Sequence, residues 1–89
     1  MLHTVNTHKL EWLVNYSLKH YAPDHDVHIH GTQVDHDHNA VICQLWIDGK
    51  QVNKICATLS DTFSDIVGTL ENQALNATYL ERAYQRQEE

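Results

Sequence analysis

The chain contains few of the residues that mark specialised protein classes. Its 89 residues include one proline, three glycines and two cysteines. Two cysteines are too few for the disulfide scaffold of a small secreted domain, and three glycines leave no glycine-rich phosphate loop. No apolar run approaches the roughly 20 residues of a membrane-spanning helix, and the first residues lack the pattern of a signal peptide. We therefore expect a cytoplasmic protein without a membrane segment, in which Cys43 and Cys56 are buried thiols.

Basic residues are also scarce. Six Lys and Arg residues stand against twelve Asp and Glu residues, which gives a net charge of −6 with histidine neutral. This acidic balance opposes wide contact with nucleic acid or anionic lipid. The hydrophobic fraction of 42% is typical of a globular chain, and the length predicts a single domain over residues 1–89. A core of this size contributes little net stability, so a dimer partner would help.

Apolar residues recur at helical spacing in residues 7–22 and again in residues 61–86. This spacing predicts two helices that each turn one face toward a core. Pro23 ends the first helix because the residue before a proline is forced out of helical geometry. The predicted N-caps are Asn6 or Thr7 for the first helix and Ser60 or Asp61 for the second.

The second predicted helix changes its apolar pattern near position 75. At 100° per residue, Leu75, Tyr79 and Ala83 lie opposite the first apolar stripe. Either the helix breaks near residues 72–76, or its last turns are packed on two sides. A helix of about 26 residues is about 39 Å long, against about 30 Å for a nine-residue strand. Its end would overhang the sheet as a frayed tail, a second short helix or a dimerisation arm.

Alternating apolar residues predict three strands, over residues 26–34, 40–48 and 50–59. Gly31 is expected to mark a β-bulge, because Val34 departs from the alternation set by Val27 and Ile29. Asp48-Gly49 predicts a type I′ hairpin turn, which needs positive φ at both positions. The resulting order, α-β-β-β-α, predicts an α+β two-layer domain in which two helices pack on one face of a three-stranded antiparallel meander.

Both faces of the predicted hairpin carry apolar residues. One face collects Val41, Cys43, Leu45, Ile47, Val52 and Cys56, and the other collects Ala40, Ile42, Trp46, Ile55, Ala57 and Leu59. The second face is more apolar than a solvated sheet face requires, which indicates a partner. We expect Trp46, with Ile42 and Ile55, to anchor that contact. The remaining aromatic positions Trp12, Tyr16 and Tyr79 are interpreted as half-buried packing residues.

Histidines form the densest cluster in the chain. Five of the eight lie within residues 25–38, and residues 24–48 also hold five aspartates with no Lys or Arg. One hypothesis is a site for a divalent transition metal, because imidazole and carboxylate ligate such ions. Its ligands would be His28, His30, His36 and His38. Their spacing matches no established zinc signature, and the alternative is an exposed strand face and a polar turn that happen to use histidine.

A second hypothesis for the same segment is a response to pH. Free imidazole has a pKa of about 6.5, and neighbouring carboxylates are expected to raise it. A raised pKa in the folded state stabilises the fold in acid, and this stabilisation is lost as the pH rises through that pKa. Mild acid would then relieve the local repulsion and favour both folding and association.

The sequence carries no motif for catalysis. There is no Gly-x-Ser-x-Gly elbow, no His-Glu-x-x-His and no Cys-x-x-Cys. We therefore predict no catalytic residue, no required cofactor and no enzymatic activity. An enzyme whose site forms only in a dimer cleft is kept as an alternative.

The α-β-β-β-α order is similar to that of double-stranded RNA-binding domains. This resemblance, which concerns element order alone, implies recognition of duplex RNA through shape and phosphate contacts. Those domains carry a basic start to their second helix and a basic strand loop. Here the corresponding segments, residues 60–65 and 35–38, are acidic, so no RNA-binding residue is carried over. We expect no nucleic-acid partner, unless charged histidines reverse the sign in acid.

These observations favour a small, acidic, histidine-rich protein-interaction domain that self-associates as a homodimer. Its predicted contacts are the second sheet face, with Trp46, Ile42 and Ile55, and the helical stripe containing Leu75 and Tyr79.

Overall fold

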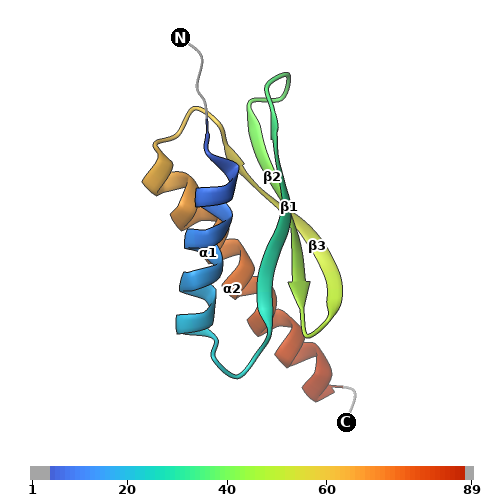
Figure 1. Ribbon diagram of the computed structural model, residues 1–89. Helices are drawn as coiled ribbons and strands as arrows, with labels where there is room; N and C mark the ends of the chain where they lie inside the picture. The colour runs from blue at the N-terminus through green and yellow to red at the C-terminus, as the bar shows by residue number, and fades with distance from the viewer. Residues whose placement is uncertain (1–4, 88–89) are drawn as a thin grey trace.

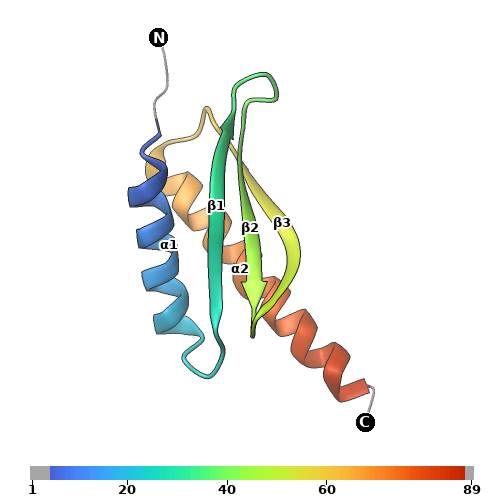
Figure 2. The same ribbon diagram turned by 45° about the vertical axis from the view of Figure 1, so that its right-hand side comes forward.

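The structure is a computed structural model in which residues 5–87 are described, with side chains as far as Leu80. Its elements are α1 (Thr7–Tyr21), β1 (Val27–Asp35), β2 (Ala40–Ile47), β3 (Lys50–Thr58) and α2 (Phe63–Gln87). The strands form one antiparallel sheet in the order β1-β2-β3, and both helices lie on the same side of it (Figures 1 and 2). This confirms the predicted α+β meander with two helices on one face.

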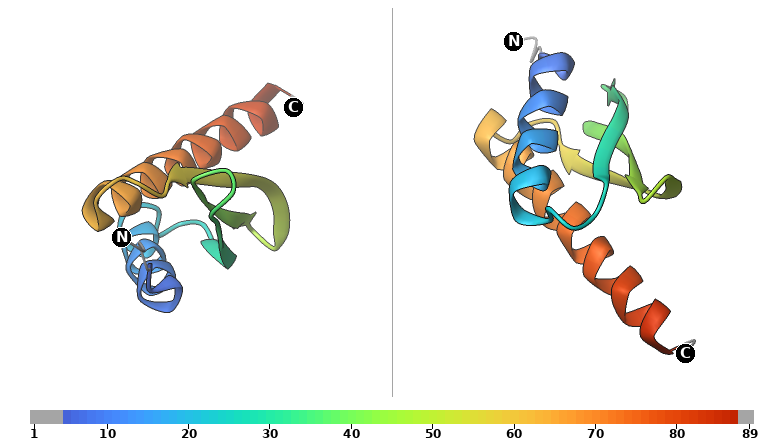
Figure 3. Two further views of the ribbon diagram at one scale, coloured as in Figure 1. Left: turned by 90° about the horizontal axis from the view of Figure 1, so that it is seen from above. Right: turned by 60° about the horizontal axis from the view of Figure 1, so that its bottom comes forward.

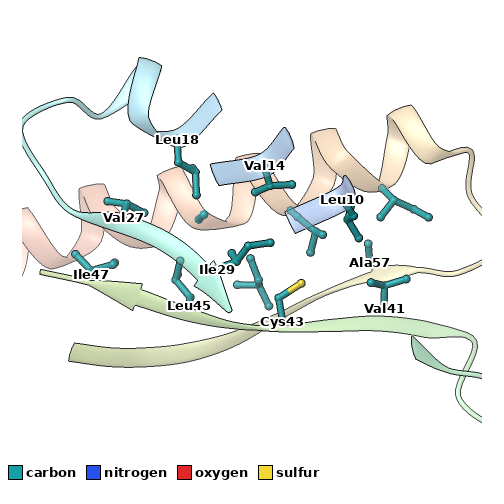
Figure 4. Close-up of a cluster of buried hydrophobic side chains, with 14 of the residues drawn as sticks. Leu10, Val14, Leu18, Val27, Ile29, Val41, Cys43, Leu45, Ile47 and Ala57 are labelled. Carbon is teal, nitrogen blue, oxygen red and sulfur yellow. The ribbon is translucent and has the colours of Figure 1, made fainter. Parts of the chain in front are cut away.

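The core lies between the helices and the inner face of the sheet. Leu10, Val14 and Leu18 of α1 are fully buried, as the helical spacing requires. Alternate residues of β2 face them from the sheet, and α2 packs against both α1 and the sheet. Figure 4 shows these side chains converging from both layers. The buried set contributed by the sheet is Val27, Ile29, Val41, Cys43, Leu45, Ile47, Ile55 and Ala57.

Local hydrogen bonds fix where the helices begin. Asn6 caps α1, since its Oδ1 accepts a hydrogen bond from the Lys9 N–H at 3.1 Å. At α2 the cap is Thr62, whose Oγ1 accepts from the Asp65 N–H at 3.2 Å. The predicted caps Ser60 and Asp61 were wrong. The Asp61 N–H bonds back to the Thr58 carbonyl at 3.1 Å, so a turn precedes the helix.

Two bulges change which side chains face the core. The register of β1 shifts between His30 and Gln33, at Gly31 with φ +65°, as predicted. A second, unpredicted shift lies in β3, where Gln51 pairs with Trp46 but Asn53 pairs with Leu45. Val52 is the extra residue, and it reverses the alternation in the rest of β3.

This second bulge overturns part of the face assignment. Ile55 and Ala57 are 5% and 6% exposed and belong to the core, so Ile55 is not on the outer face with Trp46. Cys56 points the other way and is exposed, whereas Cys43 is buried as predicted. Because Ile42 pairs directly with Cys56 across the two strands, both lie on the outer face. The outer face is consequently less apolar than the sequence pattern indicated.

Asp48 and Gly49 connect β2 to β3 through the predicted tight turn. Their φ angles are +51° and +83°, the positive pair that a type I′ turn requires. Glycine adopts this conformation without steric cost, and aspartate tolerates it better than most residues.

The second helix is continuous and does not break at residues 72–76. Among the described side chains, its buried positions are Ile66, Leu70, Ala74 and Thr78, each one turn after the last. The helix then continues to Gln87, and its C-terminal end extends past the edge of the sheet (Figures 2 and 3). Twenty-five residues make a helix of about 37 Å, longer than the layer against which it packs.

Candidate interaction surface

The histidines of the 25–38 segment do not meet at one point. Four of them each place Nδ1 near a different carboxylate. The pairs are His25–Asp48 at 2.8 Å, His28–Asp26 at 3.3 Å, His30–Glu11 at 3.7 Å and His38–Asp35 at 2.7 Å. Within the described part of the chain, no group of three or more His, Cys, Asp or Glu side chains is placed to hold a metal ion.

The four predicted metal ligands are therefore not brought together. His28 and His30 do share the outer face of β1, as their spacing implied, but their rings turn toward different partners. His36 and His38 lie in the exposed turn after β1, and His38 bonds to Asp35 within that turn. Sequence spacing correctly predicted the shared face but could not identify which carboxylates would approach the rings.

Asp48 ties the hairpin turn to the segment that precedes β1. Its Oδ2 lies 2.8 Å from His25 Nδ1, and its Oδ1 accepts from the Asp26 N–H at 3.0 Å. The Asp48 N–H in turn donates to the Asp26 carbonyl at 2.8 Å. The hydrogen bond with His25 is the main reason that the pKa of Asp48 is lowered, and the bond with His38 lowers the pKa of Asp35 in the same way.

The outer face of the sheet is mixed rather than apolar. Trp46 lies directly opposite His28, and their rings are stacked with centroids 6.4 Å apart. Trp46 and Ile42 are both partly buried. The Trp46 Nε1 group is shielded from solvent and has no hydrogen-bond partner. The positions paired across the strands around them are polar, and they include His30, Gln33, Gln44, Gln51 and Lys54.

The free edge of β1 is occupied by a side chain from α1. Asn15 Oδ1 accepts from the Ile29 N–H at 2.7 Å, and Asn15 Nδ2 donates to the Ile29 carbonyl at 3.1 Å. The amide thus takes the place of one residue of a neighbouring strand. An incoming strand would have to displace Asn15 to pair at this point.

The free edge of β3 is protected in the same manner from α2. Gln73 Oε1 accepts from the Cys56 N–H at 3.2 Å, and Gln73 Nε2 donates to the Cys56 carbonyl at 2.8 Å. Beside it, the Lys54 N–H donates to Asn53 Oδ1 at 3.1 Å, and the Thr58 carbonyl accepts from the Asp61 N–H. We call the Asn15 and Gln73 contacts the amide clamps. The sequence did not predict these contacts, because the position of an amide side chain on a helix does not indicate which backbone groups it will bond.

Among the side chains that the structure describes, the large exposed hydrophobic ones are on the helices instead. They are Trp12, Tyr16, Tyr21, Tyr79 and Leu80, which are 58–70% exposed. Trp12 and Tyr16 stack on one another with centroids 5.5 Å apart. The interpretation of Trp12, Tyr16 and Tyr79 as half-buried packing residues was therefore wrong, because each points away from the sheet. Leu75, in contrast, packs partly against the core.

Two grooves run along α2, and Tyr16 lines the first of them. The first, about 290 Å³ in volume, runs between the helices and is lined by Leu13, Tyr16, Ser17, Phe63, Ser64, Val67 and Glu71. The second, about 390 Å³, follows the exposed side of α2 and is lined by Asp61, Ser64, Asp65, Gly68, Thr69 and Asn72. Ser64 lines both grooves, so they meet at the first turn of α2.

Comparisons with protein-family models, with curated proteins and with solved structures found no match to this chain. No helix in the described residues is both long and apolar enough to cross a membrane.

Proposed function

We propose that the protein is a small, non-enzymatic interaction domain of the cytoplasm that self-associates as a homodimer through its helices. The observation that carries this proposal is the end of α2. Its last buried side chain among those described is Thr78, yet the helix continues to Gln87. Tyr79 and Leu80, the first two residues beyond Thr78, are 58% and 70% exposed.

A second copy that packs on Tyr79 and Leu80 would bury two side chains that are exposed in the single copy. A helical stretch without tertiary packing is marginal in water, because most helical stability in proteins comes from a buried apolar face. Fully burying one large apolar side chain contributes roughly 1.5–3 kcal/mol. In a symmetric dimer every such contact occurs twice, so Tyr79 and Leu80 can offset part of the entropic cost of association.

The other surfaces support association through the helices rather than the sheet. The amide clamps occupy the backbone groups of Ile29 and Cys56, which is one position on each free edge at which an added strand would otherwise pair. The outer sheet face surrounds Trp46 with polar side chains. Two free cysteines accord with the reducing cytoplasm that we propose.

Sedimentation equilibrium on the wild-type chain and on the double variant Tyr79→Ser/Leu80→Ser tests this proposal. We expect the wild type to be dimeric at high micromolar concentration and the double variant to be monomeric. Tyr21→Ser is the matched control, since Tyr21 is equally exposed, at 62%, but lies at the end of α1. A wild-type chain that remains monomeric at high concentration would contradict the proposal.

A second candidate function, a pH-responsive module, is favoured by the four histidine–carboxylate pairs. Each pair is an ion pair only while its imidazole is protonated and its carboxylate is ionised. Thermal unfolding and oligomeric state measured from pH 5 to 8 test it. A flat profile in both measurements would remove this candidate.

A further inference from the structure

We propose that the outward side of α1 is a second binding surface, which takes an acidic and apolar peptide segment of a partner protein. This inference goes beyond the proposed self-association and does not depend on it. It follows from the charge and the aromatic residues of α1, from the groove beside them and from the acidic residues across that groove.

The exposed positions of α1 combine basic and aromatic side chains. Apart from Tyr21, the last residue of the helix, they fall within a sector of about 120° at 100° per residue, opposite the buried Val14. We call this set the basic strip, and its members are His8, Lys9, Trp12, Tyr16, Lys19 and His20. Trp12 and Tyr16 are 63% and 67% exposed. The ten residues from Lys9 to Lys19 give the strip a length of about 15 Å.

The strip is positively charged, although the whole chain has a net charge of −6. α1 contains one acidic residue, Glu11, which is half-buried and lies beside a histidine of β1. Neither Lys9 nor Lys19 forms an ion pair within the part of the chain that the structure describes. Lys19 borders a hollow that also contains Asp24 and Asp26, but it pairs with neither. Both lysines are therefore available to anionic groups of another molecule.

The fold of one copy does not explain the position of Lys9. This residue lies in the first turn of α1, which contains no acidic residue and where the positive end of the helix dipole disfavours a cation. Its ammonium group lies 5.8 Å from the centroid of the Phe63 ring, a cation–π contact that offsets part of this cost. The contact also places the charge of Lys9 beside the groove that Phe63 lines. An anionic ligand of that groove would therefore meet Lys9.

The groove between the helices supplies apolar contacts next to the strip. It has a volume of about 290 Å³, and its apolar lining consists of Leu13, Tyr16, Phe63 and Val67. Tyr16 belongs to both the groove and the strip, and it stacks on Trp12 with ring centroids 5.5 Å apart. The surface thus offers lysines at its ends and aromatic and aliphatic contacts between them. This combination fits a peptide that carries both carboxylates and apolar side chains, as in helix-in-groove recognition.

Acidic residues across the groove favour a peptide over other anionic partners. Glu71 lines the same groove, and Asp61 and Asp65 line the neighbouring one. Nucleic acid carries a negative charge on every nucleotide, and an anionic bilayer presents a wide negative surface, so both would also approach these carboxylates. A peptide carries carboxylates at particular positions and can set them against the two lysines alone. A peptide segment therefore matches the charges on both sides of the groove.

Selection from a random peptide library displayed on phage tests this inference without assuming a ligand sequence. The wild-type chain is the target, and we expect the enriched peptides to combine Asp or Glu with large apolar residues. Single-stranded DNA and vesicles that contain phosphatidylserine are the competing anionic probes. The inference is overturned if no peptide is enriched, if the enriched peptides lack acidic residues, or if either competing probe binds more tightly than the peptides.

Charge reversal then locates the peptide on the strip. The dissociation constant of a synthetic copy of an enriched peptide is measured by fluorescence anisotropy. We expect Lys9→Glu/Lys19→Glu to weaken binding about tenfold or more. This variant should instead prefer a peptide in which lysine replaces each acidic residue. The matched control is Lys50→Glu/Lys54→Glu on exposed β3 positions, which should leave binding unchanged. If the two double variants bind the peptide equally, the strip is not its site.

The fluorescence of Trp12 provides an independent readout. The chain has two tryptophans, so Trp46→Phe leaves Trp12 as the single emitter. Peptide binding should shift its emission to shorter wavelengths, because the ring loses contact with water. Unchanged emission at saturating peptide would contradict contact with the strip. Circular dichroism verifies that each variant is folded.

Sedimentation equilibrium separates this inference from the proposed self-association. Lys9→Glu/Lys19→Glu and Trp12→Ser/Tyr16→Ser should both lose peptide binding and keep the oligomeric state of the wild type. If the aromatic double variant instead loses the dimer, a second copy covers the strip and the inference is overturned. A wild-type monomer that binds the selected peptides would refute the self-association and leave the peptide site supported.

Discussion

Asp48 adopts a turn conformation and makes three polar contacts. A substitution can remove the negative charge of its side chain without changing the shape of that side chain. Asp48→Asn preserves the turn, since Asn-Gly also favours type I′, and it preserves the oxygen that accepts from the Asp26 N–H. It removes only the negative charge near His25. Because the pKa of Asp48 is lowered in the folded protein, its contribution to stability is present above the ordinary aspartate pKa of about 3.9. That contribution is lost as the pH falls through the lowered pKa.

Thermal unfolding of the wild type and Asp48→Asn across acidic and neutral pH measures this effect. We expect the wild type to be the more stable at pH 5 to 6 and the difference to disappear in strong acid. Asp37→Asn, an exposed acid in the turn after β1, is the control and should leave the acid profile nearly unchanged. If the difference in stability between the wild type and Asp48→Asn were the same at every pH, the Asp48 charge would not act through its hydrogen bond.

Individual residues also show where sequence reasoning reaches its limit. The shared face of His28 and His30 was predictable from a period of two along a strand. Their pairing with Asp26 and Glu11 was not, because Glu11 lies on α1 and approaches only after folding. The exposure of Cys56 depends on one extra residue, Val52, and valine carries no signal of a bulge.

At the scale of elements, Gln73 couples α2 to the edge of β3. Gln73→Ala removes two hydrogen bonds and leaves the Cys56 N–H and carbonyl to solvent. We expect a loss of about 1–2 kcal/mol in unfolding free energy and faster amide exchange at Cys56. Asn72→Ala, an exposed neighbour on the same helix, is the control. Unchanged exchange at Cys56 would show that the clamp does not protect this edge.

Asn15 performs the corresponding role for β1, but at a site closer to the core. Ile29 is 1% exposed, so Asn15→Ala would leave backbone groups near a buried side chain without partners. We expect a larger loss, about 2–3 kcal/mol, and formation of higher oligomers as the edge becomes free to pair. Ser17→Ala on α1 is the matched control. If the stability and the light scattering of Asn15→Ala equal those of the wild type, Asn15 does not protect the edge of β1.

The elements themselves were more predictable than their contacts. Helical spacing, Pro23 and Asp48-Gly49 are local signals, and they define the order α-β-β-β-α correctly. The outer face was misjudged because alternation was carried through β3 without its bulge. The continuity of α2 was left open because the apolar pattern changes near Leu75, although the helix runs unbroken from Phe63 to Gln87.

At the scale of the whole molecule, a truncated chain tests folding and the proposed dimerisation separately. All the described core side chains lie at or before Thr78, so a chain ending at Leu80 keeps every buried contact among the side chains that the structure describes. We expect it to fold, to be monomeric and to melt at a temperature independent of protein concentration. The full chain should melt at a higher temperature as its concentration rises, because dimerisation stabilises the folded state by mass action. On dilution, the melting temperature of the full chain should approach that of the truncated chain. Calorimetry on both chains across a concentration series provides the measurement. A truncated chain that still dimerises would place the interface elsewhere, and one that fails to fold would show that residues 81–89 support the core directly.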